Sequence, residues 1–513
     1  MKKTLSLVLA LLLVLTAFGT SALADEYPIV SEPITVTGLV AGGSVGEERI
    51  LWTELEKLTG IHVDWMAVES DSMAVFMAAG NWPDFFHFSM SSAFINDYGI
   101  LGGMFVDYNE HLDEMPNFVQ ALEDYSELRK AITETNGAIY QLPYIEESAT
   151  TCQARFYYRE DTLRDAGCEV PTTTEEFYDV LVKLKEYNDG AAPLIAVVNG
   201  NYFEPFMYAS FGPSRSADFE DDGEGNVVFN RTSEQYKLYL EYMNRLYAEG
   251  LLHQEFLTMD NTTRLSLAQA GLGVFMDGVG QSLTEADFAS GTCEIGVLAP
   301  LTSEYDDERV VMGRYPFSAT KCAINASSQY VSEICRLFDI LYATEEVAPG
   351  TGLYGEAGCY GPEGIMWKFA DEEHNYYEFI LPEDYEGTVT NYQYEHVIYD
   401  NFGRATALSH AVTSTPGNAQ ERQLGFLENL IPYQEDTPFP TSFLKFTEDE
   451  QFVLDNNYVE IKSKVDEMRS QFITGVADID EQWDAYVNEL YAMGLDEVLK
   501  VYQASYDRWN GKN

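Results

Sequence analysis

Hydrophobic and polar positions change their period twice between residues 33 and 66. Residues 33–40 (PITVTGLV) alternate and are rich in β-branched side chains, which predicts a strand. Residues 47–58 place apolar side chains at helical spacing, at Ile50, Leu51, Leu55 and Leu58. Alternation returns at residues 61–66 (IHVDWM), after a glycine that would end the helix. A strand, a helix and a strand in this order form a βαβ unit, so we expect a parallel sheet covered by helices.

Strands and helices continue to alternate along the chain. Extended segments are predicted at residues 84–88, 138–144, 154–158, 272–276 and 322–325. Helices are predicted from the threonines at 172–174 to about residue 187, and at residues 233–249, 330–342, 459–472 and 481–509. No segment repeats at a fixed period, so solenoids and propellers are not expected. The pattern therefore predicts an α/β fold.

Residues 1–24 have a different composition from the rest of the chain. Two lysines stand at the tip, an apolar run follows at residues 5–18, and Ala22-Leu23-Ala24 close the segment. This order is typical of a secretory signal peptide, so we expect cleavage after Ala24 and an extracytoplasmic protein, periplasmic or secreted. The first cysteine is Cys152, so we expect no lipid anchor near the cleavage site. No later stretch approaches about 20 uncharged apolar residues, so no membrane-spanning helix is expected.

The composition indicates a large, acidic, globular protein. Its 513 residues exceed one ordinary core, so two domains are expected. The 84 acidic residues outnumber 30 basic ones, and the net charge of −54 repels nucleic acid and anionic membranes. A neutral small molecule is therefore the favoured partner, with an anion held in a local basic pocket as the alternative. The six cysteines form no C-x-x-C pair, and we expect buried thiols rather than disulfides.

The common sequence motifs of enzymes and cofactor sites are absent. The chain has no H-E-x-x-H, G-x-S-x-G or Walker motif, and no G-x-G-x-x-G between a strand and a helix. Its seven histidines stand apart, so a zinc site could form only by assembly in three dimensions. Adjacent carboxylates could serve a glycosidase, although such pairs are common in so acidic a chain. They are Glu146-Glu147, Glu175-Glu176 and Glu345-Glu346. We expect no cofactor and no metal.

One acidic loop fits two different structures. Asp218, Glu220, Asp222 and Gly223 occupy positions 1, 3, 5 and 6 of a calcium-binding loop. Position 12 is Phe229, where such a loop needs a bidentate glutamate, and no helical pattern flanks the segment. The run DGEGN that begins at Asp222 also suits the turn of a β-hairpin. The hairpin is the favoured interpretation, with calcium binding as the alternative.

Six segments together carry a resemblance to a known family. The most specific are the strand after Trp82-Pro83, the G-x-x-Y-x-L-P run at 137–143, and the P-T-T-T-E-E helix start at 171–176. The full set is residues 51–65, 78–88, 136–144, 157–181, 242–252 and 481–508. In this order they resemble the extracellular solute-binding proteins of ABC importers. That group includes maltose-binding protein, and the resemblance is greatest to its branch of LipO-type lipoproteins and alginate-oligosaccharide-binding proteins.

The resemblance implies an α/β fold of the periplasmic-binding-protein type II class, with two lobes and a ligand cleft between them. The N-terminal lobe would comprise residues 25–150 plus about 322–370. The C-terminal lobe would comprise residues 151–321 plus about 371–513.

Ligand-binding residues in this family lie on loops that follow strands. By position, the resemblance points to Glu47, Phe88, Ser91, Glu146, Tyr202, Phe203, Glu204, Asp277 and Gly278. Tyr202 and Phe203 would form an aromatic platform for the apolar face of a sugar ring. Asp277 would accept hydrogen bonds from hydroxyl groups. The alternative is that both rings belong to the core and that Asp277 only begins a turn.

The leading hypothesis is that the protein is the substrate-binding component of an ABC importer and not an enzyme. It would bind an oligosaccharide or similar solute by closure of the lobes. The expected partners are this solute and ABC permease subunits in the membrane, with no nucleic acid, and a monomer is expected. The alternative is a secreted polysaccharide-cleaving enzyme that uses a carboxylate pair. A third hypothesis, a surface adhesin, lacks the sequence repeats that would favour it.

Overall fold

Two compact units make up the chain. The computed structural model describes residues 27–42, 49–147, 155–196, 202–278, 283, 293–385, 392, 395–397, 402–434 and 439–512. Unit 1 comprises Met1–Ser148 and Pro316–Ala411, and unit 2 comprises Ala149–Tyr315 and Val412–Asn513. The predicted signal peptide and Glu47 lie outside the described residues.

The predicted lobe boundaries differ from this division in the second half of the chain. Residues 371–411 belong with unit 1 because β13 (Gly403–Ala405) adds a strand to its sheet beside β4 (Leu142–Glu146). The boundary predicted near residue 322 would cut β10 (Phe317–Ile324), which lies wholly in unit 1. A strand as short as β13 carries too few residues to show a period in the sequence.

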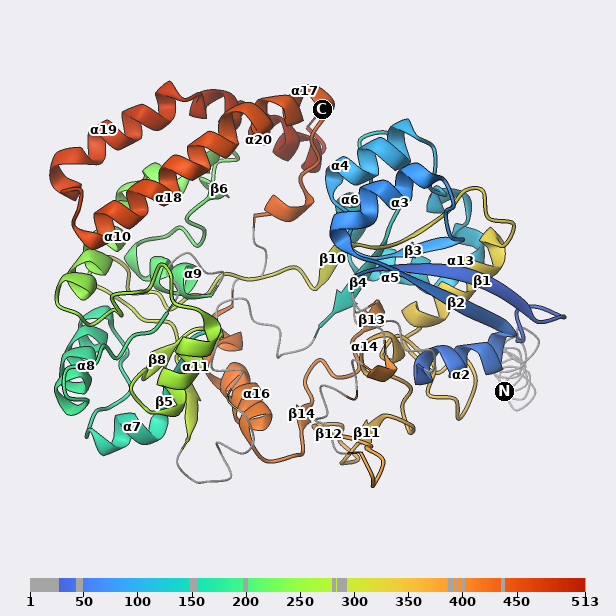
Figure 1. Ribbon diagram of the computed structural model, residues 1–513, viewed down its shortest axis with the longest axis horizontal. Coiled ribbons are helices and arrows are strands. Elements are labelled where there is room, and N and C mark those ends of the chain that lie inside the picture. Colours follow the sequence, from blue (N-terminus) through green and yellow to red (C-terminus); the bar gives the residue numbers. More distant parts are fainter. Residues whose placement is uncertain are drawn as a thin grey trace, which may run out of the picture. The chain divides into compact units, whose positions relative to one another are not determined.

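A six-stranded sheet forms the centre of unit 1, in the order β13-β4-β10-β3-β1-β2 (Figure 1). Its remaining strands are β1 (Ile34–Ala41), β2 (Ile61–Val68) and β3 (Phe85–His87). β1 is parallel to β2 and β3, and β13 is parallel to β4, whereas β10 is antiparallel to both β3 and β4. Five strands therefore end at the same edge of this sheet, and β10 begins there.

The predicted βαβ unit is confirmed at the start of the described chain. α2 (Ile50–Thr59) connects the parallel strands β1 and β2, and it buries Leu51, Trp52 and Leu55. The helix ends at Gly60, whose left-handed backbone (φ 79°) allows its N–H to donate to the carbonyl of Glu56. The period of the apolar positions thus specifies both the helix and the side that it buries.

The other main helices of unit 1 are α3 (Met73–Ala79), α5 (Pro116–Asp124), α6 (Leu128–Ile132) and α13 (Val331–Asp339). Asp339 ends α13, and its carboxylate accepts hydrogen bonds from the backbone N–H groups of Asn117 (3.2 Å) and Phe118 (2.8 Å). These groups belong to the first turn of α5, which has no capping side chain of its own. α13 therefore supplies the N-terminal cap of α5.

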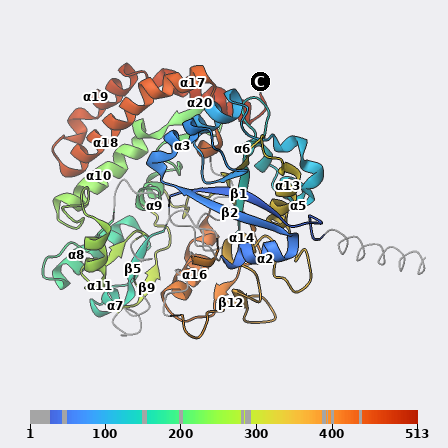
Figure 2. The ribbon, with the colours of Figure 1, turned by 45° about the vertical axis from the view of Figure 1, so that its right-hand side comes forward.

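A small sheet of order β8-β5-β9 lies in unit 2 together with most of the helices (Figure 1). Its strands are β5 (Tyr157–Arg159), β8 (Phe275–Met276) and β9 (Ile295–Val297). The long helices include α8 (Thr174–Tyr187), α10 (Glu234–Ala248), α18 (Val459–Thr474), α19 (Ile479–Ala492) and α20 (Leu495–Trp509). α8 and α10 begin as predicted, because Thr173 and Ser233 accept from backbone N–H groups three residues ahead, each at 3.1 Å. In Figures 1 and 2, α10 lies beside α18, and the two pack together.

The helix predicted over residues 481–509 is two helices. Gly494, with a left-handed backbone (φ 99°), separates α19 from α20. The helical spacing of apolar residues continues across this glycine in the sequence. One glycine inside a helix costs only about 1 kcal/mol, so the sequence alone does not predict that the helix ends there. Tyr502 of α20 then stacks on Phe219, with ring centroids 3.6 Å apart.

Five described cysteines are thiols. Cys293, Cys322, Cys335 and Cys359 are buried and Cys168 is half-buried, as expected from the sequence for most of the cysteines. Cys152 lies outside the described residues.

Within the part of the chain that the structure describes, no helix is long and apolar enough to cross a membrane.

Candidate functional site

The carboxyl edge of the sheet in unit 1 carries three of the predicted ligand-binding residues. Phe88 and Ser91 follow β3, and Glu146 ends β4. The chain also leaves or re-enters unit 1 at this edge, after β4, before β10 and after β13. Ligands of open α/β sheets bind outside the carboxyl ends of the strands. This edge is therefore the candidate site of unit 1.

Ser91, and not Phe88, offers a polar group to solvent at this edge. Phe88 is 7% exposed, and its ring packs edge-on to Phe86 and Phe94 in the hydrophobic core. A ligand-stacking role for Phe88 therefore has no exposed ring face to support it. Ser91 is exposed, and its Oγ accepts a hydrogen bond from the Phe94 N–H at 3.2 Å, which leaves its O–H able to donate.

Glu146 is half-buried at the point where β4 ends. Its backbone N–H donates to the carbonyl of Pro316 at 2.7 Å. Glu356 is almost fully buried, and its carboxylate accepts the backbone N–H groups of residues 406, 407 and 408 at 2.9–3.0 Å. Burial raises the pKa of Glu356 to about 7, and the charge of Glu146 shifts it in the same direction. Glu356 thus stabilises the turn after β13 through these hydrogen bonds. The side chain of Glu146 is partly exposed to solvent at the sheet edge.

Arg404 belongs to this region but carries no sequence motif. It lies on β13, where its Nη2 pairs with Asp124 at 2.7 Å and its Cζ lies 5.2 Å from the centre of the Tyr125 ring. Among the described residues, its Nε and Nη1 atoms are buried without a hydrogen-bond partner. Buried guanidinium N–H groups are strong donors. In a chain with few basic residues, an arginine close to a strand end is the only sequence signal that could have marked it.

In unit 2 the predicted residues also follow strands that end at one edge. β5 is antiparallel to β8 and β9, and Leu194 forms a parallel bridge to Phe275 of β8. Tyr202, Asp277 and Gly278 therefore come after strand ends at the edge where β5 begins. Arg155 precedes β5, and its Cζ lies 5.6 Å from the centre of the half-buried Tyr202 ring, an independent sign that these segments meet.

Phe426 of α16 (Asn418–Asn429) is the other aromatic partner of Arg155, with the guanidinium carbon 5.8 Å from its ring centre. Arg155 therefore lies near two rings, each within the range of a cation–π contact. Tyr202, Arg155 and Phe426 form the candidate site of unit 2, and Gly278 lies at the same edge with part of its surface exposed.

Two predicted ligand contacts of unit 2 are instead buried. Phe203 has no exposed surface, and its ring packs against Phe156 with centroids 5.1 Å apart. The prediction of an exposed platform is therefore wrong for Phe203. Asp277 is 3% exposed and forms an ion pair with Arg264 of α11 (Asn261–Gln269), so its carboxylate anchors that helix and is not open to a ligand. A residue after a strand looks the same in sequence whether its side chain faces the core or solvent.

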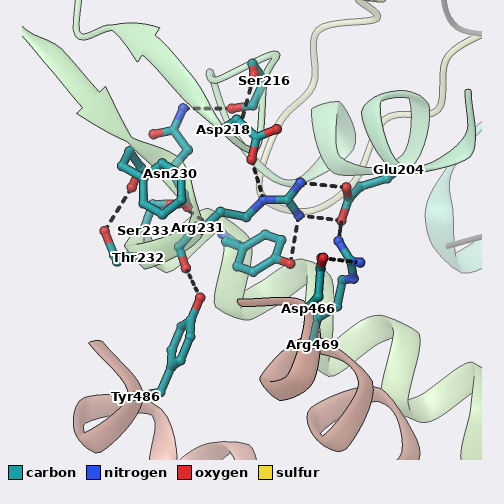
Figure 3. A network of polar contacts seen from close by, with 12 residues as sticks. Glu204, Ser216, Asp218, Asn230, Arg231, Thr232, Ser233, Asp466, Arg469 and Tyr486 are labelled. Carbon is teal, nitrogen blue, oxygen red and sulfur yellow. Dashed lines mark hydrogen bonds and ion pairs between the residues drawn. The ribbon is translucent and has the colours of Figure 1, made fainter. Parts of the chain in front are cut away.

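Glu204 lies in a buried network of ion pairs (Figure 3). Arg231 donates to both of its carboxylate oxygens, at 2.6 and 2.8 Å, and also to Asp218 at 2.9 Å. Arg469 of α18 lies 3.7 Å from the same Glu204 and donates to Asp466 at 2.7 Å. Although burial disfavours the charged guanidinium, Glu204 and its neighbours raise the pKa of Arg231 well above its usual value.

This network joins α9 (Phe203–Tyr208) to α18 and lines a pocket of about 390 Å³ in unit 2. The pocket also contains Lys462 and Ser216. The charges within the network satisfy one another, so Glu204 acts as an ion-pair partner that stabilises unit 2. The predicted ligand contact by Glu204 has no unused carboxylate oxygen to support it.

The acidic loop is a β-hairpin, as the favoured interpretation predicted. β6 (Phe219–Asp221) pairs antiparallel with β7 (Val227–Phe229). The turn is held by the chain itself, because Asp222 accepts the N–H groups of Glu224 and Asn226 at 2.8 and 3.1 Å. Phe229, at the position that a calcium loop gives to glutamate, is buried. Protein groups therefore bond the oxygens that calcium would need.

Calcium is expected to leave the melting temperature of the metal-free protein unchanged within about 1 °C, because a cation that gains no ligands adds no binding free energy to the folded state. The measurement is differential scanning calorimetry of chelator-treated protein with and without calcium. Asp222→Ala is the control, since it removes one carboxylate of the turn. A rise of several degrees in the wild type that disappears in this variant would contradict the expectation.

The adjacent carboxylates considered for a glycosidase have structural partners in each pair. Glu147 accepts the hydroxyl of Tyr125 at 2.6 Å. Glu175 pairs with Arg245 at 3.0 Å. Glu176 accepts both the N–H and the hydroxyl of Thr172, at 2.8 and 2.7 Å, as a helix-capping residue does. Glu346 accepts the backbone N–H of Gly350 at 2.6 Å.

Comparison with known proteins identifies relatives along nearly the whole chain. The family described as bacterial extracellular solute-binding protein matches residues 44–318, and a domain of unknown function (DUF3502) matches residues 442–511. The fructooligosaccharide ABC transporter substrate-binding protein FusA of Streptococcus pneumoniae is 23% identical over 487 residues, which are 90% of this chain and 87% of FusA. Lipoprotein LipO of Bacillus subtilis is 27% identical over 223 residues, which are 40% of this chain and 42% of LipO.

Solved structures show the same fold. FusA in complex with kestose has a TM-score of 0.70 at 20% identity, over 94% of this chain and all of that one. The alginate-binding protein AlgQ2 without calcium ion has a TM-score of 0.68 at 21% identity, over 93% of this chain and 99% of that one. These likenesses establish a two-lobed type II periplasmic-binding-protein fold with mixed helix and sheet.

Proposed function

Because the chain belongs to the bacterial extracellular solute-binding proteins, we propose that it captures an oligosaccharide for an ABC importer. The observation that carries this proposal is the likeness to FusA over nearly the full length of both chains. FusA is named for fructooligosaccharide and has been solved with kestose, and AlgQ2 is named for alginate. Oligosaccharides are thus the solute class that these relatives share.

The proposed solute contacts come from the strand edges of each unit. In unit 1 they are Ser91 and Glu146, which offer hydroxyl and carboxylate groups to sugar hydroxyls. In unit 2 they are Tyr202 with Arg155, and Gly278 allows close approach to its backbone. Glu47 is included because it follows β1, whose end lies at the edge of unit 1. Hydroxyl-rich solutes suit these contacts, and the net negative charge of the chain favours an uncharged one.

We propose further that the protein binds its solute without cleaving it. The relatives named above are binding proteins, and the carboxylate pairs considered for hydrolysis serve helix caps, turns and ion pairs. The test is prolonged incubation with each bound oligosaccharide, followed by chromatography of the sugars. Release of shorter sugars at a rate abolished by Glu146→Gln would establish the alternative, a secreted glycan-cleaving enzyme.

The experiment that tests solute capture is a thermal-shift and calorimetric screen with kestose, nystose, alginate oligosaccharides and maltooligosaccharides. A ligand that binds only the folded state must raise the melting temperature. At a ligand concentration of about a hundred times Kd, it adds about 2.7 kcal/mol to the free energy of unfolding. At least one of these sugars is expected to do so. If all of them leave the melting temperature unchanged and give no heat of binding, the oligosaccharide proposal is wrong.

Tyr202→Ala is expected to weaken binding of the best sugar from this screen about tenfold, since a stacking ring contributes roughly 1–2 kcal/mol. The melting temperature without sugar should change little, because the ring is only half-buried. Isothermal titration calorimetry measures the affinity. The matched control is Tyr187→Ala, which removes an exposed ring at the end of α8 and should leave affinity unchanged. Equal affinities of Tyr202→Ala and wild type would remove Tyr202 from the site.

A further inference from the structure

Three side chains of different chemistry meet in unit 1, away from the strand edge described above. His111 lies between the short helices η3 (Tyr108–Glu110) and η4 (Leu112–Glu114), Glu114 ends η4, and Cys335 lies in α13. One nitrogen, one oxygen and one sulfur atom from these residues all lie within 4.8 Å of one another. The histidine is far from the cysteine in sequence, so only the fold brings this set together.

Two buried polar atoms of these residues have no hydrogen-bond partner among the described residues. The atoms are His111 Nδ1 and Glu114 Oε2. They face each other at 3.5 Å, which is longer than a normal hydrogen bond. Buried polar atoms are nearly always bonded, and an exception calls for a specific explanation such as a bound ion. Cys335, the third member, is a fully buried thiol.

We propose that His111, Glu114 and Cys335 bind a zinc ion. Imidazole nitrogen, carboxylate oxygen and thiolate sulfur are the three donor types that zinc takes in proteins. Calcium and magnesium require oxygen ligands and are therefore excluded by the donor set. Zinc bonds of roughly 2.0–2.3 Å place tetrahedral ligand atoms about 3.3–3.8 Å apart, and the nitrogen–oxygen distance already lies in that range. A small movement of the sulfur completes the set, and water fills the fourth position.

The surroundings favour entry of a cation. Glu114 also lines a pocket of about 360 Å³, whose other charged side chains are Asp339, Glu345, Glu346 and Arg336. Four carboxylates against one guanidinium give this pocket a negative potential that attracts divalent cations. The side chains of His111 and Glu114 are 23% and 32% exposed, so the ion can reach them without unfolding of α13.

The site would tie the segment between η3 and η4 to α13. Zinc binds cysteine as a thiolate, so the proton of the Cys335 thiol passes to solvent when the metal binds. The site is independent of solute capture, since neither its residues nor its pocket includes a proposed sugar contact.

The test uses the full chain after chelator treatment and dialysis, with cobalt(II) as the spectroscopic probe and zinc as the competitor. Bound cobalt should give a thiolate-to-metal absorption band, which zinc abolishes. Cys335→Ala should lose this band, while Cys359→Ala, which removes another buried thiol of unit 1, should keep it. His111→Gln and Glu114→Gln alter half-exposed side chains and should each weaken zinc binding at least tenfold in a competition titration.

A cobalt band that survives in Cys335→Ala, or the absence of any band in the wild type, would overturn the proposal. Unchanged zinc affinity in both His111→Gln and Glu114→Gln would overturn it as well, and this arm does not depend on the folding of the cysteine variant. Zinc should also raise the melting temperature of the wild type and not that of Glu114→Gln. None of these results changes the outcome of the sugar screen, so the two proposals fail separately.

Discussion

Replacing Arg231 with alanine is expected to lower the free energy of unfolding by about 3–5 kcal/mol, because it leaves a buried carboxylate without its partner. Glu204 is the carboxylate concerned, and each side chain of the pair is only 7% exposed. Arg469 remains 3.7 Å away and offers one weaker contact in place of the two that Arg231 makes. Urea unfolding followed by fluorescence measures the loss.

The matched control for Arg231→Ala is Arg164→Ala. Arg164 forms an ion pair of the same length, 2.6 Å, with Glu294, but the side chains are 58% and 46% exposed. Exposed pairs contribute about 0–1 kcal/mol, so this variant should unfold nearly as the wild type does. The double variant Glu204→Met with Arg231→Met should recover part of the stability lost in Arg231→Ala. Equal losses in Arg231→Ala and Arg164→Ala would contradict the role given to burial.

Glu356→Ala is expected to cost unit 1 about 3–5 kcal/mol, since it leaves three backbone N–H groups without acceptors and each costs roughly 1–3 kcal/mol. The groups belong to Thr406, Ala407 and Leu408. The loss should appear as a lower urea midpoint for the transition of unit 1. Tyr125→Phe, which removes a hydroxyl that donates to the exposed Glu147, is the control and should cost less than about 1 kcal/mol.

Glu356 also gives unit 1 a specific dependence on pH. Burial raises its folded-state pKa to about 7, above the value near 4.5 of an ordinary glutamate. The folded protein therefore binds more protons than the unfolded chain between these values, and the stability from this group falls as pH rises from about 4.5 to about 7. Glu356→Gln removes the titrating group, so the difference in unfolding free energy between wild type and variant should decrease over this range. A difference independent of pH would contradict the raised pKa.

The sequence predicted the elements that repeat a period or carry a cap. The βαβ unit at residues 34–68 follows from alternation and helical spacing, and α8 and α10 begin at the threonine and serine that the capping rules indicate. β13 escaped prediction because its three residues are too few to show alternation. Its position in the sheet depends on β4, which is more than 250 residues away in sequence.

The candidate site could be predicted only as a set of loops. Strand ends marked Ser91, Glu146 and Tyr202, but the same rule also selected Phe88, Phe203 and Asp277, which are buried. Whether a side chain faces solvent depends on neighbours from distant elements, as when Arg264 covers Asp277. Arg155, Arg404 and the three ligands proposed for zinc lie in no motif, because their proximity is a product of the tertiary structure.

The stacking of Tyr502 on Phe219 has a consequence for the order in which the protein is made. The hairpin of β6 and β7 is bonded to α20 by Gln503, whose Oε1 accepts the N–H of Val227 at 2.7 Å from 276 positions along the chain. At about 5–20 residues per second, a ribosome needs roughly 15–55 s to cover that interval. The hairpin therefore lacks its ring stacking with Tyr502 and its hydrogen bond to Gln503 until α20 has been synthesised. Residues 442–511 match a separate domain family but belong to unit 2. We therefore expect that a chain truncated before these residues cannot complete the folding of unit 2.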